Sequence, residues 1–92
     1  MILSFADKDT ETLTRGYRVP RWSAVATVAR RKLAQINAAA SLAFLCSPPG
    51  NRLELLKGDR AGQFSIRIND QFRICFRWVD GDVHAVEIVD YH

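Results

Sequence analysis

The sequence predicts an α+β domain in which two N-terminal helices pack on one face of a small antiparallel β-sheet. Apolar residues recur at helical spacing in the first half of the chain, and runs that alternate between apolar and polar residues fill the half after Asn51. A strong hairpin signal, Asp80-Gly81, lies between the last two of these runs. Segregated helices and strands are typical of an α+β fold, and 92 residues suit a single domain over residues 1–92.

The longest predicted helix is amphipathic. It begins at about Pro20, which the first turn of a helix tolerates, and ends at about Ala38. Its apolar stripe consists of Trp22, Val25, Ala26, Ala29, Leu33, Ile36 and Ala40. Arg30, Arg31 and Lys32 lie opposite or beside this stripe, so we expect them to form a solvated helix face.

Short elements flank this helix. Residues 1–5 predict a short strand, and the polar run 7–16 predicts either one helical turn or a loop. A second short helix is expected at residues 41–45. The run 47–50, Ser-Pro-Pro-Gly, ends helical structure because proline lacks the N–H donor and restricts the preceding residue.

The pattern of apolar and polar residues after Asn51 predicts strands joined by turns. The expected strands are residues 53–57, 64–68, 72–78 and 83–91. Within the second and third, apolar side chains occupy every other position, which places them on one face of the sheet, toward the helices.

The loop between the second and third strands decides which residues face each other. A three-residue loop at 69–71 pairs Ile66 with Ile74, and it sets Arg67 opposite Arg73 on the other face of the sheet. We call that face the arginine face. Two like charges across a ladder disfavour pairing. Either both guanidinium groups turn into water, or a phosphate satisfies both of them; the pattern alone leaves both interpretations open.

The last strand carries residues suited to proton transfer. If the two-residue turn Asp80-Gly81 is followed by a strand without a bulge, His84, Asp90 and His92 lie on the arginine face. Tyr91 then lies on the core face.

One residue conflicts with this register. Glu87 would point into the core while Val86 and Ile88 point outward. A β-bulge in this strand would correct the conflict, and it would also exchange His92 for Tyr91 on the arginine face.

The composition limits the class of protein. The net charge of +3 permits a polyanionic partner without requiring one. We expect no membrane segment and no signal peptide, since no apolar run is long enough. Cys46 and Cys75 are too few for a disulfide scaffold and lack metal-ligand spacing, so we expect a buried free thiol at Cys75, a reducing cytoplasm, and neither a metal nor a cofactor.

The residue types on the arginine face suit RNA chemistry. Histidine transfers protons near neutral pH, and arginine stabilises charge on a phosphoryl group. Together they can cleave RNA with the neighbouring 2′-hydroxyl as nucleophile. His84 is better explained as a structural or solvated residue, and His92 alone is weak support. The turn from Lys57 to Arg60 is either a solvated hairpin turn or a phosphate-contacting loop.

Four motifs carry a family resemblance. They are LKGDR at 56–60, SIRIND at 65–70, RICFRW at 73–78 and DYH at 90–92. With these motifs at these spacings the chain resembles the HigB-type toxins of the RelE/ParE superfamily. The resemblance covers nearly the whole chain, and it implies helices packed against an antiparallel sheet.

The resemblance also implies an activity and partners. It implies metal-independent cleavage of mRNA in the ribosomal A site of the 70S ribosome. The implied partner is a HigA-type antitoxin with a helix-turn-helix domain, and operator DNA is contacted through that antitoxin. The implied location is the cytoplasm.

Five residues match positions tied to activity in such toxins, namely Lys57, Arg73, Asp90, Tyr91 and His92. The resemblance implies that Arg73 contacts the scissile phosphate, that Lys57 supports the same charge and that His92 transfers a proton. Asp90 would orient His92 or the substrate, and Tyr91 would pack against or contact the nucleotide.

Two further arginines are candidate RNA contacts, and one position differs from the pattern of some family members. Arg60 and Arg67 are expected to contact RNA. Some relatives carry histidine where this chain has Glu54. Two alternative functions remain: a ParE-like poison of DNA gyrase, and an inactive module that only binds a protein or RNA.

Overall fold

The computed structural model describes residues 1–47 and 49–90. Its elements are α1 (Lys8–Thr14), a 3-10 turn (Pro20–Val25), α2 (Ala26–Ala38), α3 (Leu42–Cys46), a 3-10 turn (Pro49–Asn51), β1 (Glu54–Leu55), a 3-10 turn (Gly58–Arg60), β2 (Phe64–Arg67), β3 (Phe72–Val79) and β4 (Asp82–Asp90). The four strands form one antiparallel sheet in the order β1-β2-β3-β4. The predicted α+β class is confirmed.

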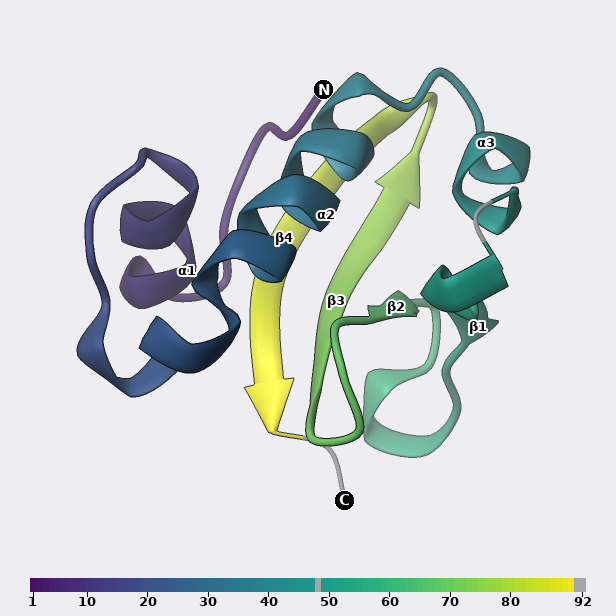
Figure 1. Cartoon of the computed structure of the whole chain (residues 1–92). Coiled ribbons are helices and arrows are strands. Elements are labelled where there is room, and N and C mark those ends of the chain that lie inside the picture. Colours follow the sequence, from purple (N-terminus) through teal and green to yellow (C-terminus); the bar gives the residue numbers. More distant parts are fainter. Residues whose placement is uncertain (48, 91–92) are drawn as a thin grey trace.

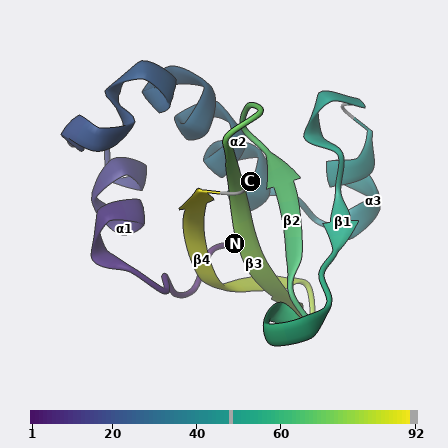
Figure 2. The same cartoon turned by 90° about the horizontal axis from the view of Figure 1, so that it is seen from below.

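The helices cover one face of the sheet. Figure 1 shows α2 lying across β3 and β4, with α1 beside β4 and α3 beside β1. Seen from below in Figure 2, the strands follow one another in order, and the opposite face of the sheet carries no helix. The fully buried side chains between the layers include Leu33, Ile36, Ile66, Ile74 and Phe76.

The helix expected from Pro20 to Ala38 is two elements. The segment Pro20–Val25 is a 3-10 turn, and the α-helix begins only at Ala26. Val25 has φ −116° and ψ 4°, which is not α-helical geometry, so the turn and the helix are separate. Trp22 is nevertheless buried in the core, as the apolar stripe predicted.

The expected solvated helix face is only partly correct. Arg31 is exposed, but the side chain of Lys32 is buried. Its Nζ donates hydrogen bonds to the carbonyl oxygens of Gly50 at 3.3 Å and Arg67 at 2.5 Å. Arg30 donates to two backbone carbonyls in and after α1.

The short elements differ in length from the prediction. Residues 7–16 contain α1, which begins with an Asp7 cap: the carboxylate accepts from the backbone N–H of Thr10. Ser41 caps α3 in the same way. The strand expected at 53–57 is only Glu54–Leu55, because Arg52 at φ 46° and Gly58 at φ 66° turn the chain on either side.

Both hairpin registers are confirmed. Ile66 pairs with Ile74 and Arg67 with Arg73 across the β2–β3 hairpin. In the second hairpin Trp78 pairs with Val83, and the turn residues Asp80 and Gly81 have φ values of 52° and 82°, as a type I′ turn requires.

A β-bulge interrupts the β3–β4 ladder. Arg77 pairs with His84 but Cys75 pairs with Glu87, so β4 has one extra residue there. Ala85 lies in the bulge with φ 55°. The bulge turns Glu87 to the arginine face.

Beyond the bulge, the side chains of β4 have exchanged faces relative to an unbroken strand. Val86 and Ile88 are buried in the core, as the conflict in the sequence required. The same shift places Val89 opposite Arg73 and Asp90 opposite Phe72.

The N-terminal segment lies along the free edge of β4. It forms two parallel bridges, Ile2 with Val83 and Phe5 with Val86, in place of the expected strand. Between them the N–H of Ala85 donates to Ser4 Oγ at 2.9 Å, which satisfies the bulged residue. None of the helices in the described part of the chain has the length and apolar character that a membrane span requires.

Candidate active site

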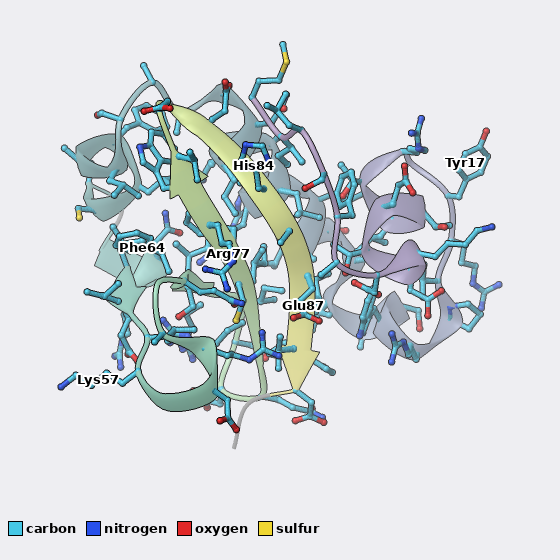
Figure 3. All side chains as sticks on the ribbon, turned by 180° about the vertical axis from the view of Figure 1, so that it is seen from behind. Tyr17, Lys57, Phe64, Arg77, His84 and Glu87 are labelled. Carbon is cyan, nitrogen blue, oxygen red and sulfur yellow. The ribbon has the colours of Figure 1, made fainter. Side chains whose placement is uncertain are left out.

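The arginine face is the side of the sheet that no helix covers. It carries Arg67, Arg73 and Arg77, together with one row of paired residues from all four strands. That row consists of Glu54, Ser65, Cys75 and Glu87. Figure 3 shows Arg77, His84 and Glu87 on this face.

Arg73 lies flat across the neighbouring strand. Its Nε donates to Ser65 Oγ at 2.8 Å, and its Nη2 donates to the carbonyl oxygen of Arg52 at 2.7 Å. Ser65 is fully buried, so the guanidinium is fixed against a rigid part of the sheet. Both of these contacts are to neutral oxygens.

A loop lies over one side of this face. The 3-10 turn Gly58–Arg60 places Arg60 Nη1 2.7 Å from Glu87 Oε1 on β4 and 3.2 Å from Gln63 Oε1. The side chains of Arg60 and Glu87 are 31% and 27% exposed, so the pair is partly shielded from water. The segment joins the antiparallel strands β1 and β2, and Lys57, Gly58 and Asp59 are exposed, so only Arg60 is folded onto the sheet. Contact of this loop with a phosphate stays a prediction.

Arg67 and Arg73 avoid each other although they are directly paired. Arg67 forms an ion pair with the exposed Asp70 in the hairpin loop, whereas Arg73 reaches in the other direction to Ser65. The like charges therefore have separate partners.

Lys57 stands apart from these arginines. Figure 3 shows its side chain extending away from the sheet, while Arg77 and Glu87 lie over it. Lys57 is exposed and directly precedes the 3-10 turn. The structure therefore does not bring Lys57 together with Arg73.

The expectation that Asp90 shares the arginine face is wrong. The bulge at Ala85 shifts the register, so Asp90 pairs with Phe72 on the face that the helices cover. There its Oδ2 accepts a hydrogen bond of 3.1 Å from Gln71 Nε2, at the edge of a hollow that also includes Arg21 and Trp22. Tyr91 and His92 lie outside the described residues, as does the expected placement of His92 on the arginine face.

Cys75 is a buried free thiol, as expected, but it lies beneath the arginine face and not among the helices. Burial raises the pKa of the Cys75 thiol above its ordinary value, and the positive charge of Arg60 opposes that rise. The thiol is therefore protonated at neutral pH and poorly suited to act as a nucleophile. In the described part of the chain, no group of three or more His, Cys, Asp or Glu side chains is arranged to hold a metal ion.

Several residues of this face were not among the sequence-predicted site residues, including Arg77, Glu87, Ser65 and Glu54. Arg77 and Glu87 lie over the sheet, and Ser65 supports Arg73. The parity of β3 indicates that Arg77 shares a face with Arg73. Glu87 required the bulge, which its inward position in an unbroken strand already suggested.

The fold is that of toxins in solved toxin–antitoxin complexes. Two structures of the YoeB–YefM complex from Staphylococcus aureus contain a chain that superposes with TM-scores of 0.61 and 0.58. Each comparison covers 100% of this chain and 95% of the other at 18% sequence identity.

Sequence comparison identifies the family. A family model for the RelE-like toxin of the type II toxin–antitoxin system HigB matches residues 4–92. Toxin HigB-1 of Vibrio cholerae is 41% identical over 83 residues, which are 88% of this chain and 87% of that protein. Endoribonuclease HigB of Proteus vulgaris is 42% identical over 41 residues, 45% of each chain. The chain belongs to the HigB-like toxins, the RelE-like toxins of type II toxin–antitoxin systems.

Proposed function

We propose that this toxin is a ribosome-dependent endoribonuclease that cuts mRNA in the A site. The observation that carries the proposal is the fixed position of Arg73, whose guanidinium is held by the buried Ser65 on an open, basic sheet face. A relative named Endoribonuclease HigB in Proteus vulgaris supports the same activity.

The proposed reaction needs no external nucleophile. The 2′-hydroxyl next to the scissile phosphate attacks phosphorus, the bond from phosphorus to the 5′-oxygen breaks, and the products are a 2′,3′-cyclic phosphate and a 5′-hydroxyl end. Arg73 stabilises the charge that develops on the nonbridging oxygens. Arg60 and Arg67 contact neighbouring phosphates. Lys57 supports the same charge after its side chain turns toward the sheet.

Glu54 is our candidate to accept the proton of the 2′-hydroxyl. It pairs with Ser65, so its side chain lies on the arginine face. Among the described residues it makes no ion pair, and its carboxylate is exposed. A carboxylate at this place takes the role that a histidine would have in some relatives.

The C-terminal residues supply the second proton transfer. We assign His92 the transfer of a proton to the 5′-oxygen as it leaves. Asp90 orients His92 or the substrate from the edge of the sheet, and Tyr91 packs against or contacts the nucleotide. The activity is exerted in the cytoplasm, where the 70S ribosome is found.

The proposed partner is an antitoxin. Two solved structures that contain a chain of this fold are complexes of YoeB with YefM from Staphylococcus aureus. We assign a HigA-type protein with a helix-turn-helix domain to this toxin, and contact with operator DNA only through that protein.

The test maps the 5′ ends of mRNA after the purified toxin is mixed with translating ribosomes. Cuts at fixed codon positions are expected, and Arg73→Ala should reduce their rate roughly 10²- to 10³-fold, the usual effect of losing one transition-state donor. Glu54→Gln and His92→Ala should each reduce it roughly 10²- to 10⁴-fold. Arg31→Ala is the matched control, since it removes the same charge from the exposed side of α2.

Three outcomes would contradict the proposal. Uncut mRNA together with trapped gyrase–DNA complexes would identify a ParE-like gyrase poison. Uncut mRNA without such complexes would identify a binding module. Cuts that persist in Arg73→Ala at the wild-type rate would place the chemistry elsewhere.

A further inference from the structure

A second basic site lies on the arginine face, near the turn formed by Asp80 and Gly81. Arg77 on β3 is paired with His84 on β4, so both side chains are on this face. Arg77 is exposed, and it forms no ion pair with any residue that the structure describes. Its charge is therefore not neutralised by an ion pair within residues 1–47 and 49–90.

The loop over the sheet fixes one side of this site. Gly62 has φ 86°, and a Cβ added there would lie 3.2 Å from Arg77 Nη1. Only glycine combines this backbone conformation with so close an approach at low cost. The guanidinium of Arg77 therefore lies directly against the loop backbone, which limits the positions that it can take.

The two basic sites are too far apart for one small anion. Arg73 and Arg77 are four residues apart on one strand, so their Cα atoms are separated by about 13 Å. The Arg60–Glu87 ion pair lies between them, on the strand positions that separate the two. A ligand that contacts both arginines must be a chain that carries more than one anionic group.

We propose that Arg77 and His84 form a second phosphate subsite, which binds the backbone of the same RNA strand whose scissile phosphate lies at Arg73. This rests on the proposed function, since it assumes that the arginine face binds RNA. The Arg77 fork donates two hydrogen bonds to phosphate oxygens, and an imidazole N–H of His84 donates a third. Contacts of this kind position a strand without reading its bases.

RNA is favoured over an acidic protein segment because the subsite continues from Arg73 along one open face. Phosphates recur at regular intervals along a strand and can meet arginines spaced along a β-strand. An acidic protein segment could bind at Arg77 alone, without contact to Arg73. This gives the two partners different experimental consequences.

Binding is measured by fluorescence anisotropy with single-stranded 2′-O-methyl RNA, which has no free 2′-hydroxyl and is not cleaved. At low salt Arg77→Ala should weaken binding by roughly tenfold or more, because both hydrogen bonds of the guanidinium to the charged phosphate are lost. The slope of log K against log salt should fall by about 0.7, the value for one phosphate contact with a single strand. Arg77→Lys should restore the slope, and Arg31→Ala should change neither quantity.

A series of RNA lengths locates the contact. The affinity of the wild-type protein should rise in a step once the RNA strand is long enough to reach Arg77. The Arg77→Ala variant should lack that step, although its protein melting temperature should equal that of the wild type. Arg73→Ala should weaken binding at every length. His84→Gln should reduce the step without removing it.

The outcomes separate this proposal from the nuclease itself. An Arg77→Ala variant with the wild-type slope and length dependence would overturn the subsite, as would wild-type protein that does not bind this RNA. Loss of binding only to an acidic antitoxin segment would show a protein contact and also overturn it. Uncut mRNA on ribosomes, with Arg77-dependent RNA binding intact, would overturn the nuclease and leave the subsite.

Discussion

Arg60 Nη1 lies 2.7 Å from Glu87 Oε1, and this ion pair joins the loop after β1 to the middle of β4. The contact exists because the bulge at Ala85 turns Glu87 to the arginine face. The shape of the candidate site therefore depends on Ala85, which takes no part in the proposed chemistry.

The Arg60–Glu87 pair should contribute measurably to stability. Because both side chains are about two-thirds shielded, we expect a double-mutant cycle with Arg60→Ala and Glu87→Ala to give a coupling energy of about 0.5–1 kcal/mol. Added salt should lower it. Arg60→Ala combined with Glu11→Ala is the control and should be additive, since Glu11 lies in α1 and pairs with Arg15. A coupling energy of zero would show that the pair contributes nothing.

The bulge itself can be tested at Ala85. The residue has φ 55°, which a β-branched side chain tolerates poorly. Ala85→Val should lower the free energy of unfolding by about 1–3 kcal/mol in urea titrations. Ala85→Gly is the matched control and should not lower it, since glycine adopts this conformation readily. Equal stability of the Val variant and the wild type would argue against the bulge.

The two cysteines should differ in reactivity. Cys46 is exposed in α3, and Cys75 is buried beneath the arginine face. A thiol reagent should modify one cysteine in the folded protein and two after unfolding, and Cys46→Ser should remove the fast reaction. Rapid modification of the folded Cys46→Ser variant would contradict the packing of the sheet.

The raised pKa of Cys75 predicts a pH dependence. In the unfolded chain the thiol has its ordinary pKa of 9.0, and burial raises it in the folded state. Below about pH 9 the Cys75 thiol therefore makes its full contribution to the free energy of unfolding. This contribution is lost as the pH rises toward the folded pKa, because the unfolded chain releases the proton first. The stability of wild type minus that of Cys75→Ala should therefore fall above pH 9. A difference that stays constant to pH 11 would contradict this.

Lys32 should contribute more to the stability of the fold than an exposed lysine does. It is buried, and it donates to the carbonyl oxygens of Gly50 and Arg67. Burial lowers the pKa of this ammonium group, and the nearby positive charge of Arg31 lowers it further. Lys32→Met should destabilise the protein by about 1–3 kcal/mol, because both carbonyls lose a donor. Lys8→Met, at an exposed position of α1, should have little effect on the urea midpoint.

Turn chemistry explains which parts of the fold could be predicted. The Asp80-Gly81 pair and the three-residue loop at 69–71 each specify a hairpin register, and both registers are as expected. The position of the bulge was not predictable, because Ala85 is not a residue type that marks a left-handed conformation. The misplacement of Asp90 follows from that single residue.

Tertiary contacts explain the rest. A lysine beside an apolar helical stripe normally extends into water, and only the backbone carbonyls of Gly50 and Arg67, far along the chain, make burial of Lys32 favourable. In the same way, the sequence identified Arg60 as basic, but not its partner on β4. Arg73 was predicted because strand parity alone places it on the open face.

The pairing of the N-terminal segment with β4 makes the order of folding events depend on synthesis. Ile2 and Val83 are bridged although 81 positions separate them, so the contact has a very high contact order. Residues 2–5 leave the ribosome well before residues 83–86, to which they bond, so these bonds cannot form until β4 has been synthesised. Until then the outer backbone of β4 has not been made, and the N-terminal segment has no strand to cover. We therefore expect docking of this segment, and with it closure of the β4 edge, to be a late step of co-translational folding.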